Sequence, residues 1–173
     1  MKVNEDALRE TEDSVGQRYR FWLLDNGHRH DAVEAILAER GYDPHLAHVS
    51  LGALERWLAR PDWETLLDSY ARCVRIARDQ QATRAIQKGL LCEPAEVALY
   101  EAYARVAPAV IATPSVDTFL GALLELKPAI ARFFDEVLVM DQDQAVRNNR
   151  LALMQAIRSL ADGIVDLTVM EGF

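Results

Sequence analysis

The chain has little of what marks a membrane-bound or exported protein. Its apolar stretches are interrupted by charges well before the roughly 20 residues that a membrane-spanning helix needs, and its first residues, MKVNEDALRETEDS, are polar. The sequence therefore predicts a cytoplasmic protein that does not contact a membrane. Its only cysteines, Cys73 and Cys92, form no paired motif. Both are expected to be reduced structural thiols, and neither a disulfide nor a metal site is expected.

The sequence also lacks the motifs of common catalytic and nucleotide-binding sites. Its eight glycines form neither GxGxxG nor GxxxxGK[ST], and neither GxSxG nor HExxH occurs. His45 and His48 could share one helix face but have no third metal ligand at matching spacing. Asp141 and Asp143 resemble the start of a calcium loop whose later glycine and glutamate are missing. We therefore expect no catalytic residue, no metal and no cofactor in this chain.

Apolar residues recur at helical spacing along the chain, and no segment alternates over the length of a strand. We predict an all-α fold, a single bundle of about seven to eight stacked antiparallel helices. The helical domain is expected to span residues 13–168, preceded by a polar, mobile leader at 1–12 and followed by a C-terminal tail at 169–173. The tryptophans occupy apolar helix positions, which favours core packing of all three: Trp22, Trp57 and Trp63.

Capping residues and helix breakers divide the domain into segments. Helices are predicted at residues 13–26, 31–40, 43–59, from 61 through the basic segment described next, from 93 to the break at 113–115, and then at 115–126, 127–139 and 143–167. Gly27 and Gly41 are the expected stops of the first two helices, and Lys127-Pro128 is the expected start of the seventh. Residues 80–92 are either a helical continuation or a loop, and we expect them to be mobile.

The net charge of −8 argues at first against a polyanionic partner such as RNA or DNA. The charge is segregated, however. Residues 69–88 carry five basic side chains against one acidic, whereas residues 31–68 carry three against eight and residues 89–126 carry one against five. One short segment of this acidic chain is therefore positively charged.

The helix that begins near Pro61 is predicted to turn this basic segment toward solvent. Its apolar positions fall on one stripe: Trp63, Leu66, Tyr70, Val74 and Ala77. Arg72, Arg75 and Arg78 fall outside the stripe, so their guanidinium groups are free to contact phosphates. Further candidate contacts lie on other helices: Arg18, Arg20, Arg147 and Arg150.

The segment VLVMDQDQAVRNNRLALM, residues 137–154, joins the last two predicted helices. Asp141 stands three residues before Gln144, at capping-box spacing. The two aspartates of this segment, Asp141 and Asp143, are therefore expected to begin the final helix. Asn149 and Arg150 project close to the apolar stripe of that helix, where polar groups need hydrogen-bond partners. We therefore expect Asp141 and Asn149 to form a structural hinge, and Asn149 and Arg150 both to hold the hinge and to face a ligand.

The same region resembles a known family. FFDEVLVMDQDQAVRNNRLALM, residues 133–154, is similar to the C-terminal segment of the bacterial glycyl-tRNA synthetase β subunit, where an FFD-x-V-x-VM run leads into a helix beginning x-A-L-R-x-N-R-L. RYRFWLLDNGHRHDAVEAILA, residues 18–38, and CEPAEVALYEA, residues 92–102, resemble two further segments of that family, in the same order. The resemblance runs over residues 15–168 and implies a DALR-type anticodon-binding domain, named for the segment that is Gln144-Ala145-Val146-Arg147 here.

The resemblance implies that the chain binds the anticodon arm of glycine tRNA, and the charge and spacing described above make the seven arginines the expected RNA contacts. Its implied partners are the remainder of the β subunit and the synthetase α subunit, and neither DNA nor a membrane is among them. ATP and magnesium would act in the catalytic part of the parent enzyme, so this chain is expected to be a non-catalytic C-terminal piece, excised or free-standing.

Two other interpretations remain open. The first is a helical protein-interaction module without RNA binding, which Ala71 favours because the family carries a lysine at that position. The second is the equivalent domain of an arginine- or cysteine-specific synthetase, which the FFDEVLVM stretch disfavours.

Overall fold

The computed structural model describes residues 5–79 and 84–173, with side chains from residue 15 onward in these ranges. Seven α-helices are present in them: α1 Glu5–Asp25, α2 His30–Arg40, α3 Pro44–Leu58, α4 Trp63–Ala77, α5 Pro94–Ala112, α6 Val116–Glu136 and α7 Gln144–Arg158. Three 3-10 turns accompany them: η1 Lys88–Leu90, η2 Ser159–Ala161 and η3 Leu167–Val169. The described ranges contain no strand, which confirms the all-α prediction. The predicted mobility at 1–4 and 80–83 lies outside the described residues.

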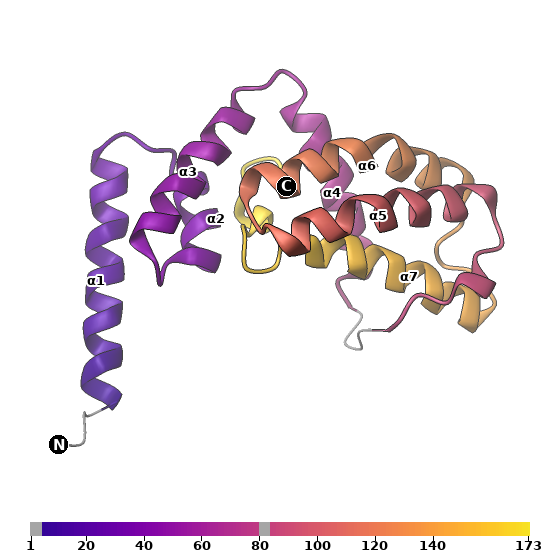
Figure 1. The fold of residues 1–173 in the computed structure, drawn as a ribbon, viewed down its shortest axis with the longest axis horizontal. Helices are drawn as coiled ribbons and strands as arrows, with labels where there is room; N and C mark the ends of the chain where they lie inside the picture. The colour runs from indigo at the N-terminus through magenta and orange to yellow at the C-terminus, as the bar shows by residue number, and fades with distance from the viewer. Residues whose placement is uncertain (1–4, 80–83) are drawn as a thin grey trace.

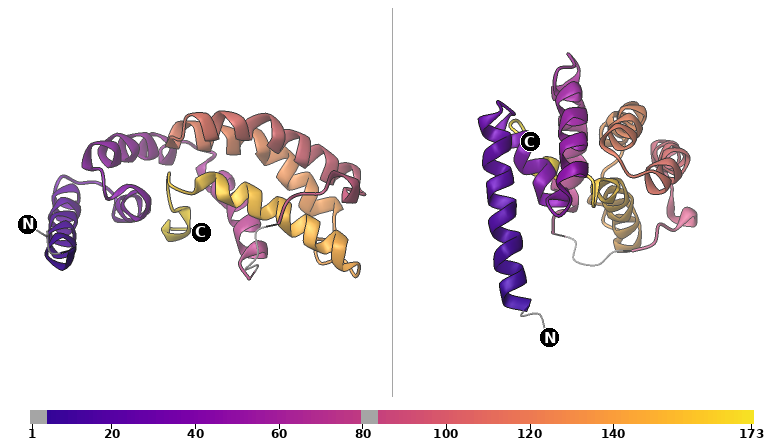
Figure 2. Two further views of the ribbon diagram at one scale, coloured as in Figure 1. Left: turned by 60° about the horizontal axis from the view of Figure 1, so that its bottom comes forward. Right: turned by 60° about the vertical axis from the view of Figure 1, so that its left-hand side comes forward.

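The helices are arranged in two groups along the long axis of the molecule (Figure 1). α5 packs beside both α6 and α7, and α4 packs against α7 and α6. α2 and α3 pack together, and α1 stands at one end, where it contacts α2 (Figure 2). In the described part of the chain, no helix combines the length and the apolar character needed to cross a membrane.

Local capping signals place most helix starts where the sequence predicts them. The Asp43 carboxylate accepts a hydrogen bond from the Leu46 amide at 3.0 Å, and Ser115 caps α6 by accepting from the Thr118 amide at 3.1 Å. Gly27 ends α1 with a φ of +88°, a conformation that glycine adopts without a steric penalty. The start of α1 differs from the prediction, because the helix already begins at Glu5, inside the predicted leader.

The predicted break at Lys127-Pro128 is wrong, because α6 runs unbroken through Pro128. A proline inside a helix removes one backbone hydrogen bond and costs about 3 kcal/mol. Ile130 and Phe133, beyond the proline, are fully buried, as is Leu126 before it. The apolar stripe thus continues across the proline and packs against α5, which offsets the lost hydrogen bond.

The final helix is shorter than predicted, because α7 ends at Arg158 and not near Leu167. The chain turns at Gly163, whose φ is +70°, and folds back so that the Asp166 amide donates to the Ala35 carbonyl at 2.9 Å. Leu167 is buried against the rest of the core despite lying outside the helix. Helical spacing of apolar residues therefore persisted past the end of the helix itself.

The cysteines are both free, and the tryptophans differ from one another. Cys73 is buried, and burial raises the pKa of its thiol to about 12, whereas Cys92 is exposed. Trp63 is buried as predicted, but the prediction of core packing is wrong for Trp22, which is 51% exposed on α1. Trp57 is half-buried, and its indole N–H donates to Asp117 at 2.8 Å.

Candidate nucleic-acid interface

α4 separates an apolar face from a basic one. Every residue of its predicted apolar stripe is buried: Trp63, Leu66, Tyr70, Val74 and Ala77. On the other side, Arg75 and Arg78 are exposed and Arg72 is half-buried. We call these three arginines the α4 arginine face.

Two guanidinium groups of the α4 arginine face lie over aromatic rings. Arg72 lies 4.3 Å from the ring centroid of Phe134 at the end of α6, and Arg75 lies 5.4 Å from that of Phe173. Each such contact stabilises by about 0.5–1 kcal/mol at an exposed site and holds the cation in place without neutralising it. Arg75 also faces Asp68 at 3.9 Å, the limit of an ion pair, with its side chain 45% exposed.

Arg78 differs from its two neighbours because its side chain contacts no aromatic ring among the described residues, and it also makes no hydrogen bond or ion pair with any of them. The α4 arginine face therefore presents two guanidinium groups that lie over rings and one that has no partner in the described part of the chain. Their charge remains available to a phosphate, since an exposed ion pair such as that of Arg75 with Asp68 contributes about 1 kcal/mol at most.

Arg150 does not face a ligand, which corrects the expectation that it has this second role. Its side chain is only 5% exposed, and its Nε donates to the carboxylate of Glu96, which is fully buried. One terminal nitrogen donates to the Leu138 carbonyl at 2.7 Å and to Asp141 at 2.8 Å. Arg150 therefore joins α7, the start of α5 and the loop after α6.

Asp141 and Asn149 lie on either side of this network. The Asp143 amide donates to Asp141 and, together with the Arg150 guanidinium, lowers the pKa of its carboxyl against the opposing effect of partial burial. Asn149 is buried, accepts from the Gln87 amide at 2.7 Å and donates to the Gln87 carbonyl at 3.1 Å. α7 is thus tied to the segment before α5.

Asp143, and not Asp141, caps α7, since it accepts from the Ala145 amide at 2.7 Å.

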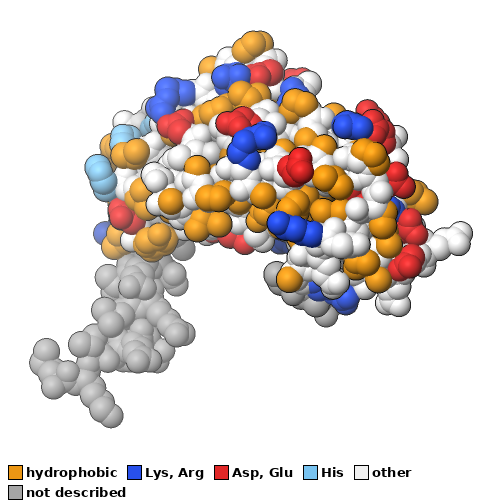
Figure 3. Space-filling model, turned by 45° about the vertical axis from the view of Figure 1, so that its right-hand side comes forward, with side chains coloured by type: hydrophobic (Ala, Val, Ile, Leu, Met, Phe, Trp, Pro, Cys, Tyr) orange, Lys and Arg blue, Asp and Glu red, His pale blue; other side chains and the backbone are white. Residues whose placement is uncertain are grey.

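The remaining candidate arginines lie on other helices than α4. Arg147 is half-buried and donates to the Asp141 carbonyl at 3.1 Å, in the loop that follows α6. Arg18 is exposed on α1, and Arg20 is ion-paired with Glu34 of α2. α1 stands at one end of the molecule and α4 near its middle (Figure 1). Basic and acidic side chains are interspersed on the face shown in Figure 3.

Two buried charged residues of this structure are absent from the sequence prediction. Glu96 accepts from the amides of Cys92 and Glu93, at 2.6 and 3.1 Å, as well as from Arg150. Arg40, at 2% exposure, is the other. The signal for Glu96 was its position three residues after Glu93, where a capping box places a carboxylate.

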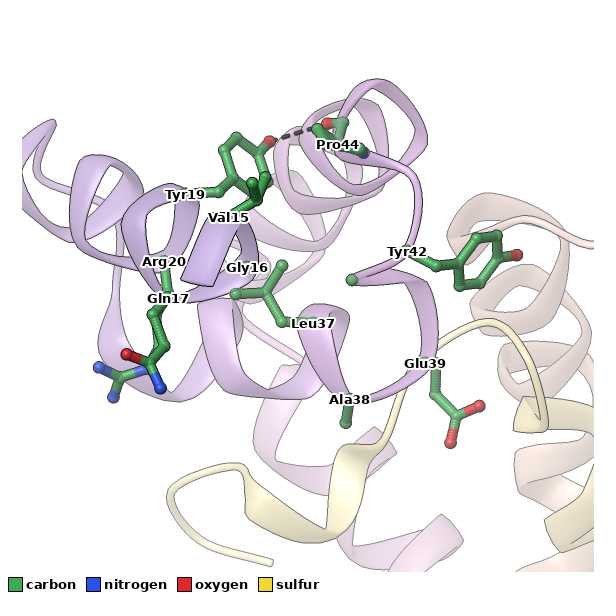
Figure 4. A pocket seen from close by; sticks show the side chains of 11 residues that line it. Val15, Gly16, Gln17, Tyr19, Arg20, Leu37, Ala38, Glu39, Tyr42 and Pro44 are labelled. Carbon is green, nitrogen blue, oxygen red and sulfur yellow. Dashed lines mark hydrogen bonds between the residues drawn. The ribbon is translucent and has the colours of Figure 1, made fainter. Parts of the chain in front are cut away.

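A second surface lies at the α1 end of the molecule, where α1 and the α2–α3 turn enclose a groove of about 640 Å³ (Figure 4). Tyr19 closes one side, with its hydroxyl donating to the Pro44 carbonyl at 2.8 Å. Leu37 lies between the helices, and Tyr42 stands at the rim with 79% of its surface exposed. The groove is therefore largely apolar and open.

Comparison with known proteins identifies the family to which this chain is similar. The DALR anticodon binding domain matches residues 66–169. The chain is 35% identical over 159 residues to the glycine–tRNA ligase beta subunit of Desulforudis audaxviator, covering 90% of this chain and 23% of that protein. For the beta subunit of Myxococcus xanthus the identity is 36% over 151 residues, covering 83% and 21%.

A plant protein gives a similar result. The chloroplastic/mitochondrial glycine–tRNA ligase 2 of Arabidopsis thaliana is 28% identical over an alignment of 174 positions, which covers 99% of this chain and 16% of that protein. The chain thus spans less than a quarter of the length of these relatives.

Proposed function

The chain belongs to the family of DALR anticodon-binding domains, and from this premise we propose that it contacts the anticodon arm of glycine tRNA. It does so as the non-catalytic part of a glycine–tRNA ligase beta subunit. The names of its relatives support the choice of tRNA, and the share of their length that it covers supports a role as one part of a larger enzyme.

The observation that carries this proposal is the α4 arginine face. One side of α4 is buried, and the other presents Arg72, Arg75 and Arg78 from the only strongly basic segment of an acidic chain. Guanidinium groups contact phosphate oxygens and fix the register of the RNA, while unstacked loop bases are read by stacking and by hydrogen bonds to their edges. Arg147 and Arg18 would add contacts at a distance from this face.

The acidic remainder of the chain limits the strength of this contact. A net charge of −8 repels RNA that approaches away from the α4 arginine face, so the chain by itself binds weakly but with a preferred orientation. The other parts of the beta subunit and the α subunit would supply most of the affinity and the ATP-dependent chemistry.

The proposal is tested by changing Arg72→Ala and Arg75→Ala together. Binding of labelled glycine tRNA should weaken, and the slope of log affinity against log salt should fall by about one per arginine, because each lost guanidinium no longer displaces a counterion. The matched control is Arg105→Ala with Arg132→Ala, two exposed arginines that face Glu125 and Glu136. An unchanged affinity and slope in the α4 variant would exclude this face from the RNA contact.

A specific observation favours a second function, docking of another protein on the α1 end. Tyr42 at the rim of the apolar groove is 79% exposed, and Trp22, which stacks on the groove residue Tyr19, is 51% exposed. Exposed aromatic side chains next to an apolar groove are typical of protein interfaces. Crosslinking in the presence of both glycine tRNA and the protein subunits separates the two functions: RNA adducts at the α4 arginine face support the first, and protein adducts alone support the second.

A further inference from the structure

A second groove, of about 450 Å³, lies between α5 and α7. Its lining includes seven apolar residues: Val110, Ile111, Pro114, Ala152, Ala156, Leu160 and Ile164. This volume is within the range of sites that take small planar ligands. The groove is part of neither the Arg150 network nor the α4 arginine face.

Five side chains that can form hydrogen bonds also line this groove: Arg84, Tyr103, Gln155, Ser159 and Asp162. Arg84, Tyr103, Ser159 and Asp162 form no side-chain hydrogen bond and no ion pair with a described residue, whereas Gln155 already has an interaction partner. Arg84 and Asp162 are exposed, so the groove offers a donor group and an acceptor group of opposite charge that are unpaired among residues 5–79 and 84–173. Tyr103 is half-buried, and burial raises the pKa of its phenol, which therefore stays protonated and able to donate.

We propose that this groove takes one unstacked nucleobase from the RNA loop that the chain contacts. The inference rests on the proposed function and adds to it a place where a base is read. A nucleobase is flat and apolar on its faces, which suits the lining of alanine and branched aliphatic residues. Its Watson–Crick edge carries donors and acceptors side by side, which the Asp162 carboxylate and the Arg84 guanidinium can pair with.

The charged pair favours a base over an apolar protein side chain. An aliphatic side chain in this groove would cover Arg84 and Asp162 without giving either a hydrogen bond, and burying an unpaired charge is costly. Arg84 also belongs to the basic segment at residues 69–88, so that segment contributes a positively charged side chain to the lining of the groove.

The test uses NMR of the full 173-residue chain, because chemical shifts detect weak binding. The probes are a hairpin with the anticodon stem and loop of a glycine tRNA and a blunt duplex of the same length. The methyl signals of Val110, Leu160 and Ile164 should shift with the hairpin and not with the duplex. Hairpins that differ in one loop base should differ in affinity. Asp162→Asn should reduce the ratio of affinities between the preferred hairpin and the hairpin with the changed loop base at least about tenfold, the effect of losing one hydrogen bond to a charged group.

Glu101→Gln, an exposed carboxylate on α5 with no partner among the described residues, is the matched control and should leave the ratio unchanged. Groove methyl signals that stay in place while the side-chain signals of Arg72 and Arg75 shift would overturn this inference and leave the proposed function standing. If neither the groove methyl signals nor the arginine signals shift at millimolar concentrations of the hairpin, both this inference and the proposed function are wrong. If the groove signals shift with a protein subunit and not with RNA, the groove is a protein contact and the inference is wrong.

Discussion

Arginine has two opposite roles in this protein, and burial distinguishes them. Arg75 keeps 45% of its side chain exposed, so its charge can act on a partner. Arg150 has three acceptors around one guanidinium, and its partner Glu96 is fully buried. A buried carboxylate of this kind depends on its cation, because a charge removed from water needs a partner of opposite sign.

Arg150→Ala should lower the free energy of unfolding by about 3–5 kcal/mol, since it leaves Glu96 buried without its cation. The measurement is urea denaturation followed by circular dichroism at neutral pH. Arg147→Ala is the control: it removes one hydrogen bond, to the Asp141 carbonyl, and should cost about 1 kcal/mol. An equal loss of unfolding free energy in the two variants would mean that the buried pair of Arg150 and Glu96 contributes no more to stability than one exposed hydrogen bond.

The sequence could identify candidate arginines but could not separate these roles. The helical period of α4 places Arg75 on the side opposite the apolar stripe, so its exposure follows from local spacing. Arg150 lies at the edge of its stripe, and its principal partner is 54 residues away in the chain. No local pattern reports on a partner at that separation, so the expectation that Arg150 also faces a ligand was wrong for a tertiary reason.

At the scale of elements, one side chain ties the segment before α5 to α7. Asn149 forms two hydrogen bonds to the backbone of Gln87, across 62 residues of sequence. Gln87 immediately precedes η1, and this short segment leads into α5. The amide of Asn149 thus takes the place of the backbone partner that a strand or helix would supply.

Asn149→Ala should release this segment without unfolding α7. The Gln87 amide loses its acceptor, so its hydrogen exchange should become about 10- to 100-fold faster, the equivalent of about 1–3 kcal/mol of local opening. Asn148→Ala is the matched control, because Asn148 is half-buried and makes no hydrogen bond with a described residue. An unchanged exchange rate at Gln87 would show that other contacts hold the segment.

Helix starts were better predicted than helix ends, and the reason is physical. A start is encoded locally, by a side chain such as Asp43 or Ser115 that accepts from an amide two or three residues on. The ends of α6 and α7 depend on packing instead. α6 continues through Pro128 because both sides of the proline are buried, and α7 stops short because the chain turns at Gly163 to cover α2.

At the scale of the whole molecule, a small number of long-range contacts join the α1–α3 end to the α4–α7 bundle. Arg40 is 2% exposed and donates to the Gly163 carbonyl at 3.1 Å, the Ser50 hydroxyl at 2.9 Å and the Pro114 carbonyl at 2.8 Å. The all-α class followed from periodicity, but this joint did not, because its acceptors come from three separate parts of the chain. The placement of α1 relative to α4, and with it the spread of the arginines, depends on such contacts.

Arg40→Leu should therefore weaken the joint between the two ends more than it weakens either end. Three acceptors lose their donor, two of them backbone carbonyls, so the free energy of unfolding should fall by about 3 kcal/mol. Unfolding followed at α2–α3 and at α5–α7 by hydrogen exchange should no longer coincide. Arg56→Leu is the matched control, since Arg56 also joins two parts of the chain, through Asp117 at 3.1 Å, but is 67% exposed and should cost 1 kcal/mol at most, as roughly expected of a surface pair. A single transition with the same midpoint in both variants would show that the two ends are held together by apolar packing and not by Arg40.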